Sequence, residues 1–209
     1  MTTAERLRTN KVEFKLSILI ITLSSRREVI KGLLDVLSHQ CAQKPVQVLW
    51  LGDNRSLITG DKRNAIMSLA NGRYLTFIDD DDMISDDYVD SILEAIGNDP
   101  ANGPEVITYL VDKQRNGQHE KFQRFNKEYG MNYTVRAAKR RYQNMLPNHL
   151  CVWRKDIVRE AFPPNTKSED LKWAARQEPH YTKEGQHHID KVLYFYRFDT
   201  SKTETQHRR

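Results

Sequence analysis

Near its middle the chain reads Gly72-Arg73-Tyr74-Leu75-Thr76-Phe77-Ile78-Asp79-Asp80-Asp81-Asp82. The apolar run 74–78 predicts a buried β-strand, and four aspartates follow where that strand ends. In open α/β sheets, ligands bind at the carboxyl ends of the strands. Four consecutive carboxylates exceed what capping the next helix requires, and they suit a hard divalent cation bound together with substrate phosphates. We therefore expect a metal and phosphate site at the edge of an α/β sheet.

Strand and helix patterns alternate on both sides of these residues. Runs rich in Ile, Leu and Val predict strands, and apolar residues at i, i+3, i+4 and i+7 predict helices. The predicted strands span 16–23, 46–51 and 106–111, and the predicted helices span 27–38, 61–70 and 87–96. The continuous apolar run 16–23 is typical of a strand covered on both faces. The sequence thus predicts an α/β fold with an open, mainly parallel sheet and helices on both faces.

The pattern weakens after residue 111. Asn116-Gly117 predicts a hairpin turn, and residues 121–141 are polar and basic. The remaining predicted elements are a return to the sheet over 150–153, a short helix over 169–176 and an aromatic strand over 192–198.

The composition is that of one globular domain. The chain has 209 residues, 38% of them hydrophobic and 29% charged, which leaves little room for two independent cores. The longest apolar run, 16–23, is far shorter than the roughly 20 residues that span a bilayer. Residues 1–8 lack the apolar segment of a secretory signal. We therefore expect a cytoplasmic protein without a membrane helix.

Charge is distributed unevenly along the chain. Residues 79–90 hold seven aspartates and no basic residue, which is costly unless a cation offsets them. By contrast, the basic segment 113–141 holds nine Lys or Arg residues against Glu120 and Glu128, in a chain of net charge +5. Such a segment suits an anionic acceptor, a membrane surface or nucleic acid, and it is equally typical of a solvated loop and helix face.

Several common phosphate and cation motifs are missing. The sequence has neither the GxxxxGK[ST] loop of P-loop enzymes nor GxGxxG after its first predicted strand, which disfavours both nucleotide-binding classes. An EF-hand is also disfavoured, because Ile84 stands where the glycine of the calcium loop should be.

Five segments stand out by their order and spacing along the chain: 16–22, Asp53-Asn54-Arg55-Ser56, Arg63-Asn64, 72–82 and Ser168-Glu169-Asp170. Together these segments resemble glycosyltransferase family 2, which has the GT-A nucleotide-sugar fold. This resemblance implies a single, abbreviated GT-A domain over 1–209. In this domain 15–111 would bind the nucleotide-sugar, and 112–209 would bind the acceptor and supply the catalytic base. UDP-linked sugars are the expected donors because the family favours them.

The resemblance also assigns residues to the donor. It implies that Asp53 and Arg63 help to hold the nucleotide base and that Thr22 lines the same pocket. Asp79 would face the ribose. Asp80 is a further candidate for donor binding, because four consecutive aspartates leave the register of the Asp-x-Asp motif open.

For the cation, the resemblance implies Asp81 as the ligand that also faces the diphosphate. Asp82 is a second candidate because of the same open register. His188, before the last predicted strand, is a further candidate ligand, although paired histidines such as His187-His188 are commonly not ligands. The expected cofactor is Mn²⁺ or Mg²⁺, since both ions prefer oxygen ligands and substrate phosphates.

Sugar transfer needs a second carboxylate. A base must take the proton from the attacking hydroxyl, and a metal-bound aspartate cannot easily do both jobs. By the same resemblance Asp170 is that base, and one-step displacement from the opposite face would invert the anomeric carbon. The alternative is that Asp170 only caps the helix that begins beside it.

The second half of the chain supplies candidates for acceptor binding. His149, Trp153 and Trp173 are suited to contact a sugar or a base. The expected acceptor is a hydroxyl on a glycan or on a hydroxylated base in DNA. For DNA, the basic segment would follow the backbone, and binding would weaken steeply with salt.

Two other classes stay open. In haloacid-dehalogenase-like phosphatases an Asp-x-Asp motif ends a strand and its first Asp is the nucleophile. That motif belongs to the first strand, whereas the aspartates here follow the third predicted strand. A nucleic-acid-binding module built on the basic segment would leave the aspartates without a purpose.

Overall fold

We describe a computed structural model of the chain, which covers residues 13–100, 102–129, 141–164 and 167–199. Within these residues the strands form one 9-stranded sheet, in the order β2-β1-β3-β8-β5-β6-β7, with β9 beside β5 and β4. The strands are β1 (Leu16–Leu23), β2 (Val46–Asp53), β3 (Tyr74–Phe77), β4 (Met83–Ile84), β5 (Val106–Arg115), β6 (Gln118–Phe125), β7 (Tyr142–Met145), β8 (Val152–Arg154) and β9 (Gln186–Phe198). The α-helices are α2 (Arg27–Gln40), α3 (Thr59–Ser68), α4 (Tyr88–Ile96) and α5 (Glu169–Gln177).

The N-terminal half follows the predicted pattern. β1 lies between β2 and β3 and is parallel to both, and its residues are buried almost throughout, which means that both faces of the strand are covered. That position explains why the strand is apolar almost throughout. The parallel pairing also brings the carboxyl ends of β1 and β3 to one edge, where the aspartates begin.

The strand directions are mixed. The first three strands are parallel, as are β5 with β9 and β6 with β7. β8 is antiparallel to β3 and β5, and β5 and β6 form the hairpin predicted at Asn116-Gly117. The α/β class and the open sheet are confirmed, but the second half of the chain inserts antiparallel strands and adds β6 and β7, which the sequence did not predict.

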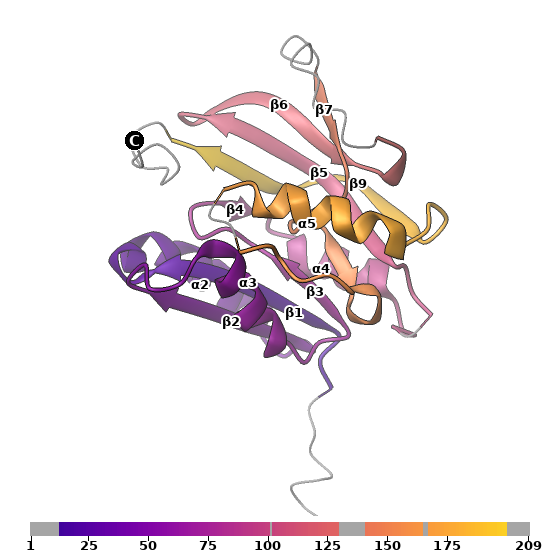
Figure 1. The fold of residues 1–209 in the computed structure, drawn as a ribbon, viewed down its shortest axis with the longest axis horizontal. Coiled ribbons are helices and arrows are strands. Elements are labelled where there is room, and N and C mark those ends of the chain that lie inside the picture. The colour runs from indigo at the N-terminus through magenta and orange to yellow at the C-terminus, as the bar shows by residue number, and fades with distance from the viewer. Residues whose placement is uncertain (1–12, 101, 130–140, 165–166, 200–209) are drawn as a thin grey trace, which may run out of the picture.

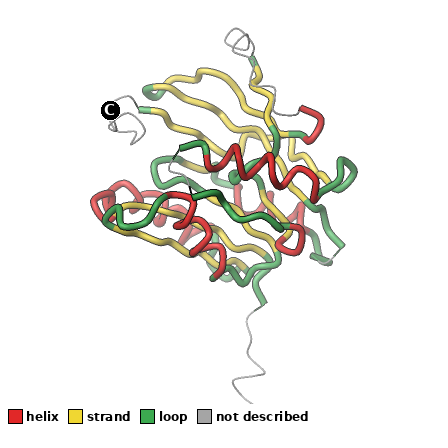
Figure 2. Tube along the Cα trace, viewed as in Figure 1, coloured by secondary structure: helices red, strands yellow, loops and turns green. Residues whose placement is uncertain are grey.

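The helices pack in two pairs. α2 contacts α4, and α3 contacts α5, so each pair shares one side of the sheet. In α2 the residues Ile30, Leu33 and Leu37 are buried, as the helical spacing predicts. Figure 1 shows α5 crossing in front of the sheet, and Figure 2 shows β6 and β7 extending above the helices. Helices α3 and α5, together with strands β5 to β7, surround the carboxyl ends of β1 and β3.

Gly72 allows β3 to start close to β1. A Cβ atom at this position would lie 2.4 Å from the backbone nitrogen of Ser17, which no side chain can tolerate. The Gly72 N–H instead donates to the Ser17 hydroxyl at 2.8 Å. A glycine is therefore required before β3, because the backbones of Gly72 and Ser17 lie too close together for a side chain between them.

Candidate active site

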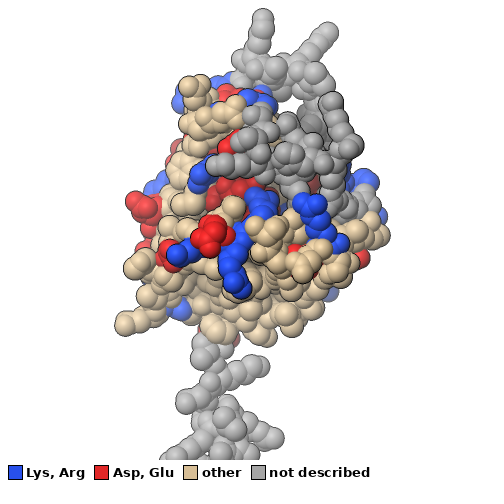
Figure 3. Space-filling model, turned by 90° about the vertical axis from the view of Figure 1, so that its left-hand side faces the viewer, with Lys and Arg blue, Asp and Glu red and all other residues tan. Residues whose placement is uncertain are grey.

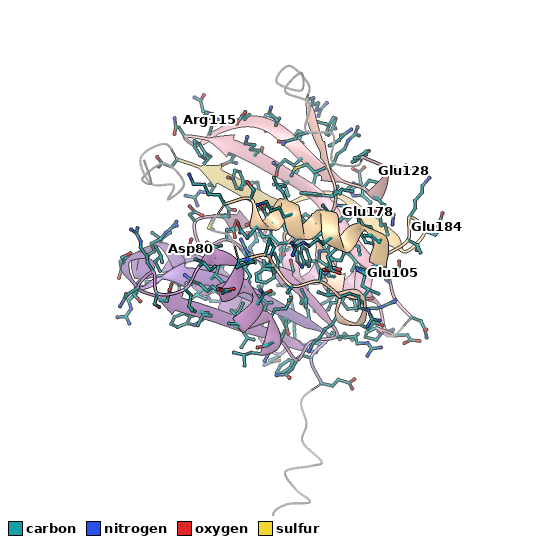
Figure 4. The ribbon with its side chains drawn as sticks, in the orientation of Figure 1. Asp80, Glu105, Arg115, Glu128, Glu178 and Glu184 are labelled. Atoms are coloured by element: carbon teal, nitrogen blue, oxygen red, sulfur yellow. The ribbon has the colours of Figure 1, made fainter. Side chains whose placement is uncertain are left out.

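A cavity of about 590 Å³ lies at the carboxyl ends of β1 and β3. Its walls come from distant parts of the sequence: the ends of β1, β3 and β9, helix α3, the first turn of α5, and strands β5 to β7. Figure 3 shows acidic side chains gathered beside basic ones on this side of the molecule, and Figure 4 places Asp80 on the side of α2 and α3. The predicted edge position is therefore a hollow with charges of both signs.

Asp80 and Asp81 both form an ion pair with the same side chain, Arg26. The Arg26 guanidinium lies 3.2 Å from Asp80 Oδ1 and 2.8 Å from Asp81 Oδ2. The Thr22 hydroxyl donates to the other oxygen of Asp80. Burial raises the pKa of Asp80 to about 6, although Thr22 and Arg26 act in the opposite direction. All four side chains line the cavity; the sequence indicated Thr22, Asp80 and Asp81 as candidates and did not single out Arg26.

Asp82 faces away from the cavity. It is 2% exposed, and its two oxygens accept from the Tyr194 hydroxyl at 2.6 Å and from the Arg197 N–H at 2.7 Å. The Tyr194 hydroxyl also accepts from the Asp79 N–H at 3.0 Å. Asp82 thus holds residues 79–82, which we call the aspartate loop, against β9. The expectation that Asp82 is a metal ligand is not supported, because its carboxylate is buried and already hydrogen-bonded.

We expect Tyr194→Phe to lower the free energy of unfolding by about 1–3 kcal/mol, because a buried carboxylate and a backbone N–H both lose a partner. Urea unfolding followed by circular dichroism measures this loss. Tyr196→Phe, two residues further along β9, removes a hydroxyl without removing either bond and should cost less. Equal losses in the two variants would contradict the fastening role of Tyr194.

Arg63 joins Asp79, at the end of β3, to helix α5. The side chain is 5% exposed, and its Nη2 lies 3.0 Å from Asp79 Oδ1 while its Nε lies 3.2 Å from Glu169 Oε1. Its guanidinium also lies over the Phe77 ring at 5.0 Å. Burial acts against the charge of Asp79, yet Arg63 and then His149 lower its pKa well below the usual range. The prediction that Arg63 belongs to the site agrees with this geometry.

Asp170 lies where α5 enters the cavity. The N-cap of α5 is Ser168, held at a φ of 58°, so Asp170 stands inside the first turn and is not the cap. The side chain of Asp170 is 26% exposed, whereas that of Glu169 beside it is 7% exposed. His149 Nδ1 lies 3.7 Å from Asp170 Oδ2. Of the neighbouring residues Glu169 and Asp170, Asp170 therefore has the more accessible carboxylate.

Asp53 is held in a local network at the end of β2. Its carboxylate forms an ion pair with Lys62 and accepts from the Leu57 N–H at 2.8 Å. Burial opposes ionisation, but Lys62 and Leu57 lower the pKa of Asp53 to about 2. Asp53 is not among the described residues that line the cavity, whereas Lys62 is. Lys62, which the sequence did not single out, thus stands between Asp53 and the site.

The family model described as Glycosyl transferase family 2 matches residues 20–162. The chain belongs to glycosyl transferase family 2. The matched range contains the aspartate loop, Arg63 and His149, so this family 2 chain carries a glycosyltransferase domain. The match decides against the phosphatase and against a module that only binds nucleic acid.

Solved structures support the GT-A fold for this family 2 chain. S. aureus TarS 1–349 in complex with UDP aligns with a TM-score of 0.59 and 17% identity, covering 88% of this chain and 60% of that chain. TarS 1–349 in complex with UDP-GlcNAc aligns with a TM-score of 0.58 and 15% identity, covering 94% and 61%. This chain thus spans about 60% of the TarS chains that it matches. The search of curated proteins finds no match.

Three sequence predictions for this family 2 chain need correction. Trp153 and Trp173 are both 0% exposed and pack edge-to-face with ring centroids 5.1 Å apart, so neither can contact an acceptor. His188 lies on β9, where its Nδ1 pairs with the Thr108 hydroxyl at 3.0 Å, and it is outside the described cavity lining. Of the predicted acceptor and histidine candidates, only His149 reaches the cavity.

Across the described residues, no group of three or more His, Cys, Asp and Glu side chains is placed to hold a metal ion. In the same part of the chain, no helix has both the length and the apolar character needed to cross a membrane.

Proposed function

We propose that this family 2 chain transfers a sugar from a UDP-sugar to an acceptor hydroxyl with inversion at the anomeric carbon. One observation carries the proposal: the cavity holds Asp79, Asp80 and Asp81 together with a separate, partly exposed carboxylate, Asp170. The two groups of carboxylates suit two jobs, donor binding and proton removal. The UDP and UDP-GlcNAc complexes of TarS support the choice of donor.

Donor binding would fall to residues 15–111. Thr22, Arg63, Asp79 and Asp80 line the cavity and are the proposed contacts for the nucleotide-sugar. The sequence assigned the nucleotide base to Asp53 as well, and we now place that residue behind Lys62, as its support. Lys62 and Arg63 line the same cavity, and their charges are paired with Asp53 and with Asp79 and Glu169, so both would hold these carboxylates in place for the donor.

The side chains in the cavity fit a divalent cation that is shared with the substrate. Asp80 and Asp81 would present oxygen ligands side by side, and their shared ion pair with the Arg26 guanidinium supports a place for positive charge here. Mg²⁺ and Mn²⁺ commonly take one or two protein carboxylates and complete their shell with substrate phosphates. Asp81, with 26% of its side chain exposed, would hold the ion, and Asp80 would support it. When bound, the ion neutralises the charge of the diphosphate leaving group.

Asp170 would act as the base. As the acceptor oxygen bonds to the anomeric carbon, the bond from that carbon to the phosphate oxygen breaks and its electron pair leaves with UDP. The hydroxyl proton passes to the Asp170 carboxylate. Because attack and departure occur on opposite faces in a single displacement, the configuration inverts. Residues 112–209 would therefore supply the base and bind the acceptor.

The acceptor class is the open part of the proposal. Lys113, Gln123 and Gln143 line the cavity on the side of β5 to β7 and are placed to meet an acceptor. Lys113 belongs to the basic segment 113–141, of which residues 130–140 lie outside the described structure. For a DNA acceptor carrying a hydroxylated base, the rate of transfer should fall steeply with added salt. For a neutral glycan, salt should change the rate little.

We expect Asp81→Asn to weaken Mn²⁺-dependent UDP binding roughly 10- to 100-fold, the cost typical of removing even a residue that supports a ligand. Isothermal titration of UDP with and without Mn²⁺ measures the effect. Asp86→Asn, an exposed aspartate in the same acidic run, is the matched control and should behave as wild type. Unchanged Mn²⁺-dependent binding in Asp81→Asn would show that another carboxylate holds the ion.

Release of UDP from UDP-sugars in the presence of Mn²⁺ tests the proposed function itself. We expect wild-type protein to release UDP, faster with a suitable acceptor, and Asp81→Asn to release far less. A panel of UDP-sugars that yields no release above the protein-free rate would contradict the proposal.

A further inference from the structure

His149 lies between two carboxylates that come from different parts of the chain. Its Nε2 is 3.5 Å from Asp79 Oδ2, after β3, and its Nδ1 is 3.7 Å from Asp170 Oδ2, on α5. The residue is 4% exposed. Its carbonyl accepts from the Phe77 N–H at 3.1 Å, and its ring meets the Phe77 ring edge-on at 6.3 Å. The imidazole is therefore fixed to β3 and spans the gap to α5.

The contact to Asp170 has a buried nitrogen at one end. His149 Nδ1 has no hydrogen-bond partner among the described residues, although it is shielded from solvent. The charged groups that face this imidazole are Asp79, Glu169 and Asp170, and Arg63 pairs with the first two. Asp170 is the one of these carboxylates that Arg63 does not pair with directly in the described ion pairs. A shift of less than an ångström would close its hydrogen bond to His149.

We infer that His149 is a positioning residue for Asp170, and this inference rests on the proposed role of Asp170 as the base. An ionised carboxylate only accepts hydrogen bonds, so the contact to Asp170 uses the N–H of His149 Nδ1. The contact to Asp79 anchors the ring on the donor side, and Nδ1 holds Asp170 Oδ2. The other oxygen of Asp170 is then left to take the proton of the acceptor hydroxyl. His149 thereby couples the position of the base to the donor-binding loop.

Three replacements separate this role from a general structural one. His149→Ala removes both nitrogens, His149→Asn retains an N–H near the place of Nδ1, and His149→Gln retains one near the place of Nε2. We expect His149→Ala to lower kcat roughly 10- to 100-fold, with the KM for the UDP-sugar changed less than about threefold. His149→Asn should recover most of the rate, and His149→Gln should not. Thermal stabilisation by UDP and Mn²⁺ should persist in all three variants.

A double replacement gives the decisive readout. If His149 acts through Asp170, adding His149→Ala to Asp170→Asn should lower kcat no further, because residues that act as a unit are not additive. Multiplying effects, or a raised KM for the UDP-sugar with unchanged kcat, would overturn the inference while leaving the proposed function in place. A wild-type rate in Asp170→Asn alone would instead overturn the base assignment on which the inference rests.

Discussion

Asp170→Asn is expected to lower kcat roughly 10²- to 10⁴-fold, the range that a positioned general base contributes. The amide cannot accept the proton of the acceptor hydroxyl, but it has nearly the same size and can keep a contact with His149. Donor binding should therefore survive. Steady-state kinetics with a saturating UDP-sugar, together with titration of UDP and Mn²⁺, separates the two effects.

The control for this replacement is Asp61→Asn, an exposed aspartate on α3, which should leave kcat unchanged. Asp170→Asn with kcat within about threefold of wild type would show that another group removes the proton. Loss of UDP binding in parallel with kcat would instead indicate that Asp170 contacts the donor.

Arg63→Met is expected to lower the free energy of unfolding by about 3–5 kcal/mol, because it breaks a buried ion pair from one side only. Asp79 and Glu169 would then face each other's charge without the guanidinium between them. The methionine keeps an apolar stem against Phe77 and so limits the packing loss. Urea unfolding measures the change, and UDP binding should fall with it because the aspartate loop loses its anchor.

The partner replacement tests the cause of this loss. Glu169→Gln removes one of the two carboxylates, so the double variant Arg63→Met with Glu169→Gln should be more stable than Arg63→Met alone. A loss below about 1 kcal/mol for Arg63→Met, or a double variant with simply added losses, would mean that the ion pairs contribute little to stability.

Much of the N-terminal half could be predicted from the sequence because burial there leaves a clear pattern. β1 (Leu16–Leu23) matches the predicted range, since a central parallel strand must be apolar on both faces. β6 (Gln118–Phe125) escaped prediction because only Gln123 and Phe125 in it are buried. Its other residues are exposed or half-buried, and all of them except Phe122 are polar. A strand that lines a binding site loses the apolar alternation by which strands are recognised.

The site was predicted as a set of segments more reliably than as a set of contacts. The strand ends place Asp79 to Asp81 at the cavity, but sequence alone cannot tell which carboxylate in an aspartate run turns inward. Asp82 turns away because the hydroxyl of Tyr194, more than a hundred residues later, donates a hydrogen bond to its carboxylate. Trp153 and Trp173 were predicted as acceptor contacts, yet large aromatic side chains fill cores more often than they line sites.

The measurement that tests the central claim most directly is the melting temperature of the wild-type chain with UDP, with Mn²⁺, and with both together. A ligand at about 100 times its Kd stabilises the folded state by about 2.7 kcal/mol, which corresponds to a rise of roughly 5–10 °C for a chain of this size. We predict such a rise with UDP and Mn²⁺ together and a smaller one with either alone. In Asp81→Asn, UDP and Mn²⁺ together should raise the melting temperature no more than UDP alone. No shift with UDP and Mn²⁺, at concentrations that stabilise a known UDP-binding protein, would contradict a UDP-sugar site in this cavity.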